Sequence, residues 1–251
     1  MSLTPADPWA PLRALTAARI ALGRAGSSLP TQAHLAFQLA HAQARDAVHH
    51  VADLDAIAAA LQAGGAAPVR VDSAAPDRGT YLLRPDLGRR LAEGAAGVLA
   101  AAAPPGGVDL AVVIADGLSG VAVERHAAPL VQLLSRALAG DGWTLAPPVL
   151  ARQGRVALGD AIGAALGARL VLVLIGERPG LSAADSLGAY LTHDPRPGRT
   201  DADRNCVSNI RPDGLPVPAA ARKLAWLLAE ARRRRVTGVT LKDDSDATLL
   251  R

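Results

Sequence analysis

The sequence is poor in aromatic residues, holds a single cysteine and lacks long apolar runs. Aromatic residues make up 2% of its 251 positions, so alanine and leucine must fill most of the core, in closely packed helices. The one cysteine, Cys206, excludes a disulfide within the chain and suits a reducing compartment. No stretch approaches the ~20 apolar residues of a membrane span, and the N-terminus has no apolar core of the signal-peptide type. We therefore expect a cytoplasmic protein without a membrane partner.

The net charge of +4 raises the question of nucleic-acid binding. Nucleic-acid modules usually cluster their basic residues and add exposed aromatic rings for stacking. Here the basic residues are scattered among acidic ones, and the one dense run, residues 232–235, ends a predicted helix, where cations favour the negative end of the helix dipole. We expect no nucleic-acid partner.

Helical periodicity dominates the first hundred residues, and a cluster of prolines and glycines at residues 104–107 then interrupts it. The pattern predicts helices at residues 32–50, 53–61 and 85–102, and a loop at residues 68–80. The expected organisation is an N-terminal helical region, residues 1–104, followed by an α/β domain, residues 105–251.

Short apolar runs alternate with helical segments after that cluster. The pattern predicts strands at residues 110–114, 149–150 and 170–175, and helices at residues 121–138, 182–187 and 218–235. Strands that are apolar on both faces indicate a parallel sheet with helices on both faces. Ligands bind beyond the carboxyl ends of such strands, so residues 116–119 and 176–181, with the polar segment 204–209, form a candidate binding rim.

The motifs of several common enzymes are absent. The chain has no G-x-G-x-x-G after a strand, no phosphate-binding loop and no histidine pair with zinc-site spacing. A nucleophile elbow at Ser119 would need glycine two residues later, where Val121 stands. Cys206 lies among amide and hydroxyl donors that suit a ligand fringed with amides or carboxylates. Glu177 follows a buried strand, and a structural carboxylate paired with Arg178 or with a neighbouring amide is the alternative to a ligand contact there. The residues alone leave the chemistry open.

Several long segments, in the same order, are found in one known family: residues 18–26, 29–31, 38–49, 81–91, 114–119, 173–181 and 204–211. With them the chain resembles the small (light) subunit of ethanolamine ammonia-lyase from residue 9 to about residue 242. The resemblance implies a Rossmann-like domain that covers the mouth of a TIM-barrel large subunit, with adenosylcobalamin held between the two in a hetero-oligomer. It also implies radical deamination of ethanolamine to acetaldehyde and ammonia, with the catalytic residues on the large subunit and no activity of this chain alone.

The same resemblance carries three cofactor contacts over to this chain: Val156 in Arg-Val-Ala-Leu-Gly-Asp, Glu177 in Gly-Glu-Arg-Pro-Gly, and Cys206 in Arg-Asn-Cys-Val-Ser-Asn. Glu177 and Cys206 belong to the rim expected from the strand order, whereas Val156 does not. Cobalt is expected to be held by the corrin, so this chain supplies no metal ligand and no catalytic residue. The chain also lacks a D-x-H-x-x-G segment, which agrees with a cobalamin that keeps its own base.

Some members of the family carry a longer N-terminal extension that directs them into bacterial microcompartments. Because about eight residues precede the similarity here, we expect a cytoplasmic complex and leave packaging in a microcompartment open. Two other functions also stay open: a self-sufficient α/β hydrolase that uses Ser119 or Cys206, and a scaffold protein without a cofactor.

Overall fold

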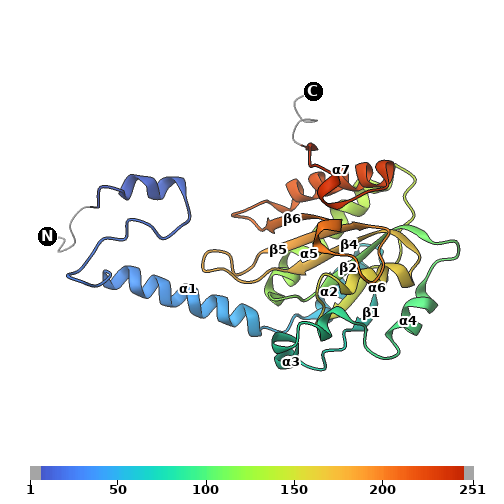
Figure 1. Ribbon diagram of the computed structural model, residues 1–251, viewed down its shortest axis with the longest axis horizontal. Helices are drawn as coiled ribbons and strands as arrows, with labels where there is room; N and C mark the ends of the chain where they lie inside the picture. Colours follow the sequence, from blue (N-terminus) through green and yellow to red (C-terminus); the bar gives the residue numbers. More distant parts are fainter. Residues whose placement is uncertain (1–6, 246–251) are drawn as a thin grey trace.

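A computed structural model describes residues 7–245 of the chain (Figure 1). The α-helices are α1 (Thr31–His49), α2 (Leu54–Ala63), α3 (Arg78–Leu83), α4 (Ala95–Ala102), α5 (Gly120–Leu138), α6 (Leu158–Ala165) and α7 (Val217–Arg234). The strands are β1 (Val69–Asp72), β2 (Val108–Ala115), β3 (Val149–Arg152), β4 (Ala168–Gly176), β5 (Leu187–His193) and β6 (Arg204–Ile210). Short 3-10 helices are η1 (Ala10–Leu15), η2 (Leu87–Arg89), η3 (Asp201–Asp203) and η4 (Gly238–Thr240). None of the helices within residues 7–245 is long and apolar enough to cross a membrane.

The strands form one mixed sheet in the order β1-β3-β2-β4-β5-β6. The first four strands in this order are parallel, as the sequence predicts. β5 is antiparallel to β4, and β6 is antiparallel to β5. This antiparallel extension needs no crossover helix because antiparallel neighbours can be joined by a short connection. The fold is therefore the expected α/β sheet, with two antiparallel strands added beside β4.

Alternate residues of the central strands enter two cores on opposite faces of the sheet. Leu110 and Ile114 of β2 pack with α2, α5 and α7, whereas Val113 of β2 and Val173 of β4 pack with α4 and α6. Each fully buried side chain of this size contributes about 1.5–3 kcal/mol through the apolar surface removed from water. The prediction of helices on both faces is confirmed.

Three local predictions are wrong. Residues 68–80, expected as a loop, contain β1 and the start of α3; the strand is too short to show a clear alternation. Residues 182–187, expected as a helix, form turns that lead into β5. Residues 85–102, expected as one helix, hold η2 and α4, with Gly94 at φ +80° before the latter. β1 precedes the Pro/Gly cluster at residues 104–107 and yet joins the sheet. The division into two domains at residue 104 stays a prediction. The first six and last six residues of the predicted domains lie outside the described residues.

The N-terminal arm, residues 7–49, extends away from the sheet and the helices that cover it (Figure 1). It comprises η1, an irregular segment and α1, which confirms the predicted helix at residues 32–50. η1 has no buried residue, and α1 buries Ala40, Ala44 and Ala47 near its C-terminal end. Nearer the N-terminus, Arg19 hydrogen-bonds to Leu181 and Ser182 in the loop between β4 and β5.

Candidate functional site

A cavity of about 420 Å³ lies at the edge of the sheet where the parallel strands end. Its walls are Leu118 after β2, Arg155 and Val156 after β3, the turn after β4, and the rings of Tyr81 and Tyr190. The carboxyl ends of parallel strands meet at one edge, which is why segments far apart in the sequence converge here. The cavity therefore occupies the position at which the sequence predicts a binding rim.

The structure brings together the three residues carried over from the resemblance. Val156, which is half-buried, and Glu177 line the cavity. Cys206 is exposed on β6, directly opposite Tyr190 of β5 in the strand register. Because residues directly opposite each other in an antiparallel pair share one face of the sheet and Tyr190 lines the cavity, the thiol lies beside the cavity wall.

Glu177 is held by one carboxylate oxygen and keeps the other available. Its Oε2 accepts a hydrogen bond from the Ser186 hydroxyl and a second, of 3.1 Å, from the backbone N–H of Asn209. Within residues 7–245 no hydrogen bond reaches Oε1. Of the two structural pairings considered, that with Arg178 is not formed, whereas that with a neighbouring amide is, through the Asn209 N–H. Glu177 is therefore oriented by its neighbours through Oε2 and keeps Oε1 as an acceptor.

Arg155 supplies an unsatisfied donor in the same cavity. Its guanidinium lies 4.3 Å from the centre of the buried Tyr81 ring, and its Nη2 donates to the Tyr81 carbonyl at 3.2 Å. The Tyr81 hydroxyl donates to the Gly154 carbonyl at 3.0 Å, which fixes the ring. The Arg155 Nε is buried and has no hydrogen-bond partner among the described residues. A buried N–H group without a partner is costly, and a ligand carbonyl would reach it only after the side chain moves, because this atom has almost no accessible surface.

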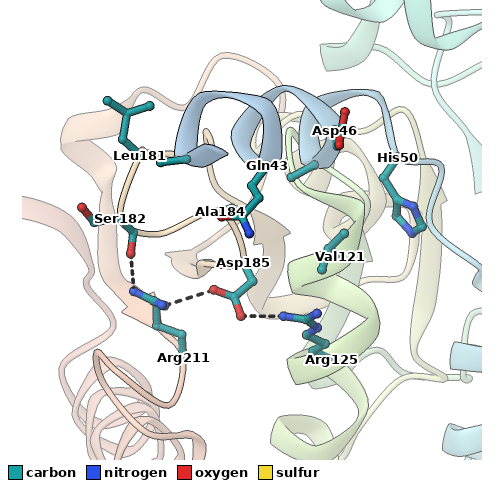
Figure 2. A pocket seen from close by; sticks show the side chains of 12 residues that line it. Gln43, Asp46, His50, Val121, Arg125, Leu181, Ser182, Ala184, Asp185 and Arg211 are labelled. Carbon is teal, nitrogen blue, oxygen red and sulfur yellow. Dashed lines mark hydrogen bonds and ion pairs between the residues drawn. The ribbon is translucent and has the colours of Figure 1, made fainter. Parts of the chain in front are cut away.

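The loop that carries Glu177 is tied to its surroundings through Asp185. Figure 2 shows the Asp185 carboxylate between two guanidinium groups, with Arg125 Nη1 at 2.9 Å from Oδ2 and Arg211 Nε at 3.1 Å from Oδ1. Burial alone would raise the pKa of Asp185, but the two arginines hold it below its usual value. Asp185 precedes Ser186, the residue bound to Glu177, so this network fixes the loop that presents the carboxylate.

A buried ion pair joins the two segments that carry Val156 and Cys206. Arg204 of β6 donates to both carboxylate oxygens of Asp160 in α6, at 2.6 and 2.7 Å, and each side chain is 2% exposed. This is the two-pronged geometry that favours Arg–carboxylate pairs. Arg204 was expected on the binding rim; it instead faces Asp160 and ties β6 to α6.

The environment of Cys206 keeps its thiol protonated. Partial desolvation by neighbouring protein atoms raises the pKa of the thiol, and the Glu177 carboxylate raises it further, against a lowering by the hydrogen bond to Tyr190. The same desolvation raises the pKa of Tyr190. Because the thiolate is the nucleophilic form, this environment suits a ligand contact better than covalent catalysis.

Comparison with known proteins identifies the family. A family sequence profile described as "Ethanolamine ammonia-lyase light chain" matches residues 6–242. The chain belongs to the ethanolamine ammonia-lyase light-chain family. It is 59% identical over 248 residues to the ethanolamine ammonia-lyase small subunit of Xanthomonas campestris pv. campestris, covering 98% of this chain and 91% of the relative. It is 58% identical over 246 residues to the protein of the same name from Ralstonia nicotianae, covering 97% and 91%. The Pseudomonas syringae pv. tomato small subunit is 55% identical over 248 residues, covering 98% and 86%.

Membership of the ethanolamine ammonia-lyase light-chain family confirms the resemblance and places the chain among the subunits of a lyase. The hydrolase alternative finds no support in the geometry. Ser119 is fully buried and caps α5: its hydroxyl donates to the Ala184 carbonyl at 2.8 Å and accepts from the Ala122 N–H at 3.3 Å. No histidine or carboxylate of the described residues hydrogen-bonds to this hydroxyl, so no base is in place to activate it.

Sequence reasoning missed Tyr81, Arg155 and Tyr190 as members of the light-chain site. Tyr81 and Arg155 lie 74 positions apart and meet because α3 packs beside the segment after β3. Tyr190 was missed because β5 itself was not predicted. A weak signal existed for the first two, since Tyr81 opens one of the segments shared with the family and Arg155 precedes Val156 in another.

Proposed function

We propose that this chain is the small subunit of an adenosylcobalamin-dependent ethanolamine ammonia-lyase and that its sheet edge holds the rim of the corrin against a large catalytic subunit. The observation that carries the proposal is the cavity lined by Val156, Glu177 and Tyr190 at the carboxyl edge of the parallel strands, with Cys206 opposite Tyr190 on the next strand.

The residues present fit the chemistry of such a cofactor. A corrin is edged with amide groups, each of which offers N–H donors and a carbonyl acceptor. The free Oε1 of Glu177 can accept from an amide N–H, and the Arg155 guanidinium, which lines the same cavity, can donate to an amide carbonyl. Val156 supplies an apolar wall beside them. Among the described residues no group of three or more histidine, cysteine or acidic side chains could hold a metal ion.

The roles of the two subunits follow from the side chains that this chain provides. When bound, adenosylcobalamin supplies the radical chemistry by which ethanolamine is deaminated to acetaldehyde and ammonia. The chain's own groups bind and orient the rim and help to exclude water from one side. With Ser119 committed to a helix cap and Cys206 kept protonated, the chain contributes position and no reacting group. The small-subunit names of its relatives imply a larger partner, and we assign the catalytic residues to that partner.

Reconstitution tests the proposal. The purified chain alone should show no ethanolamine deaminase activity, and mixing it with the large subunit from the same source should give both bound cobalamin, seen in the visible spectrum, and activity. Deaminase activity of the chain alone would contradict the division of roles. An assembled complex that retains no cobalamin would support the cofactor-free scaffold instead.

A further inference from the structure

The N-terminal arm carries apolar side chains that the chain itself does not cover. Trp9 is 65% exposed, Leu15 82%, Leu35 57%, Phe37 42% and Leu39 61%. Soluble monomers rarely display apolar residues so close together on one projecting segment, and such patches mark sites of protein contact. On the body of the protein, exposed apolar side chains such as Val98 and Val239 are scattered singly, which is ordinary.

The chain also exposes more surface than its size requires. Its accessible surface is 13264 Å², whereas a compact monomer of this mass exposes about 10,400 Å². The difference exceeds the ~800 Å² that each partner buries in an interface of standard size. The projecting arm (Figure 1) is the part of the fold that departs most from a compact shape.

The arm begins beside the candidate cofactor site. Arg78 donates to the carbonyl of Val48 at the end of α1, at 2.8 and 2.6 Å, and to the Gly117 carbonyl at the end of β2, at 2.6 Å. The same guanidinium lies over the Tyr81 ring that lines the cofactor cavity. Further along the arm, Arg19 donates to the Leu181 carbonyl, in the loop after Glu177, at 3.0 Å. The root of the arm is thus anchored beside the sheet edge that forms the candidate cofactor site.

A second cavity, of about 440 Å³, lies at this junction. Figure 2 shows Gln43 and Asp46 of α1 on one side and the Asp185 network on the other. Its lining is polar and open to solvent at the root of the arm. A partner chain bound both to the arm and to the sheet edge with the candidate cofactor site would contact the polar side chains that line this cavity.

The charge of the arm favours a partner other than a second copy of this chain. Residues 8–44 contain three arginines, Arg13, Arg19 and Arg24, and no acidic residue. Two such arms would repel one another, and the whole chain is itself positively charged, at +4. The match to the family begins at residue 6, so the arm belongs to the part of the chain shared with other light chains. An apolar surface flanked by carboxylates is the complement that this arm requires.

We propose that the N-terminal arm is a docking surface for the large subunit, which lays an apolar face flanked by acidic residues along η1 and α1. This inference rests on the proposed function, because it takes the partner from it. Leu35 and Leu39, four residues apart on α1, lie on one face of the helix and form the centre of the contact. Arg13 and Arg24 lie at the margin of this contact and attract the acidic residues of the large subunit as it approaches.

The test measures binding of the full-length chain to the large subunit by sedimentation. The Leu35→Glu/Leu39→Glu double variant should bind on the order of tenfold more weakly or worse, with an unchanged far-UV circular dichroism spectrum because both side chains are already exposed. Val239→Glu, which changes an equally exposed apolar residue outside the arm, serves as the matched control and should bind like the wild type. Arg13→Ala and Arg24→Ala should slow association and weaken its dependence on salt.

Unchanged affinity of the double variant, with the wild-type complex intact and loaded with cobalamin, would overturn the docking surface and leave the proposed function standing. A wild-type chain that forms a dimer by itself, which the double variant abolishes, would assign the arm to a second copy and overturn the proposal as well. Failure of the wild-type chain to bind the large subunit would overturn both proposals.

Discussion

The buried pair of Asp160 and Arg204 offers the sharpest test of how the site is held together. The two side chains are each 2% exposed and joined by two short hydrogen bonds. Replacing Asp160 leaves the buried Arg204 guanidinium with only the exposed Asp201 carboxylate, 3.8 Å from its Nε, and breaking a buried pair in this way costs about 3–5 kcal/mol. For a chain of this length each kcal/mol lowers the melting temperature by about 2–4 °C. Asp160→Ala should therefore lower the melting temperature of the full-length chain by ~6–20 °C.

Removing both charges together should cost much less. In Asp160→Leu/Arg204→Met no charge is left without a partner, and apolar replacements of buried pairs are often neutral or stabilising. Arg204 also donates to the Thr192 hydroxyl at 2.9 Å and to the Arg199 carbonyl at 3.1 Å, and losing these bonds costs about 1 kcal/mol each. The double variant should therefore lose about 2 kcal/mol and recover roughly a third to three fifths of the stability lost in Asp160→Ala.

Urea unfolding followed by circular dichroism gives the free energy of unfolding for both variants. Cobalamin affinity of each complex, measured in parallel, reports whether the pair also sets the spacing of the segments that carry Val156 and Cys206; we expect weaker binding even where stability is regained. A loss below about 1 kcal/mol in Asp160→Ala, or a double variant as unstable as the single one, would refute this account of the pair.

Two further predictions concern the loop after β4. Glu177→Ala should weaken cobalamin binding to the complex by about tenfold to a hundredfold, because a hydrogen bond to a charged acceptor contributes about 1.5–3 kcal/mol. Glu177→Gln should lose less affinity, and the control Glu230→Ala should lose none. Equal affinity in all three variants, measured by absorbance titration, would return Glu177 to a structural role. Asp185→Asn should lower the free energy of unfolding by about 1 kcal/mol at pH 7, discounted for the partial exposure of Arg125. The folded-state pKa of Asp185 lies below its usual 3.8. The stability that the ionised carboxylate gives the wild type is therefore lost as the pH falls from 3.8 through the lower, folded-state pKa. A difference in unfolding free energy between wild type and Asp185→Asn that is as large at pH 2 as at pH 7 would contradict the ion pair.

The central strands were predictable because their signal is local. The run Leu-Val-Leu-Val-Leu-Ile at residues 170–175 is apolar at every position, and only a strand covered on both faces explains it. β5 and β6 gave no such signal, because both contain polar side chains, among them Thr192 of β5 and Arg204 of β6. Which strand each of them pairs with is decided by contacts between distant segments. The antiparallel pairing of β4 with β5 and of β5 with β6 could therefore not be predicted from the sequence.

The candidate site was predictable in part for a similar reason. Glu177 follows an evident strand, so its place at the sheet edge could be inferred. Val156 came from the resemblance to a known family and from no local pattern. Arg155 and Tyr81 depend on a contact between distant segments, which neither periodicity nor spacing reveals. The exposed apolar face of α1 was also unforeseen, since helical spacing shows that a face is apolar and not what covers it.

Protection of Cys206 from alkylation tests the central claim most directly. It is the only cysteine of the chain, and its raised pKa predicts slow reaction with iodoacetamide at pH 7 that accelerates toward pH 9. At pH 9, mass spectrometry of the Cys206 peptide should show that cobalamin slows the reaction by at least about tenfold in the complex with the large subunit, because the bound rim covers the thiol. The same alkylation rate with and without bound cobalamin would contradict a corrin held at this edge of the sheet.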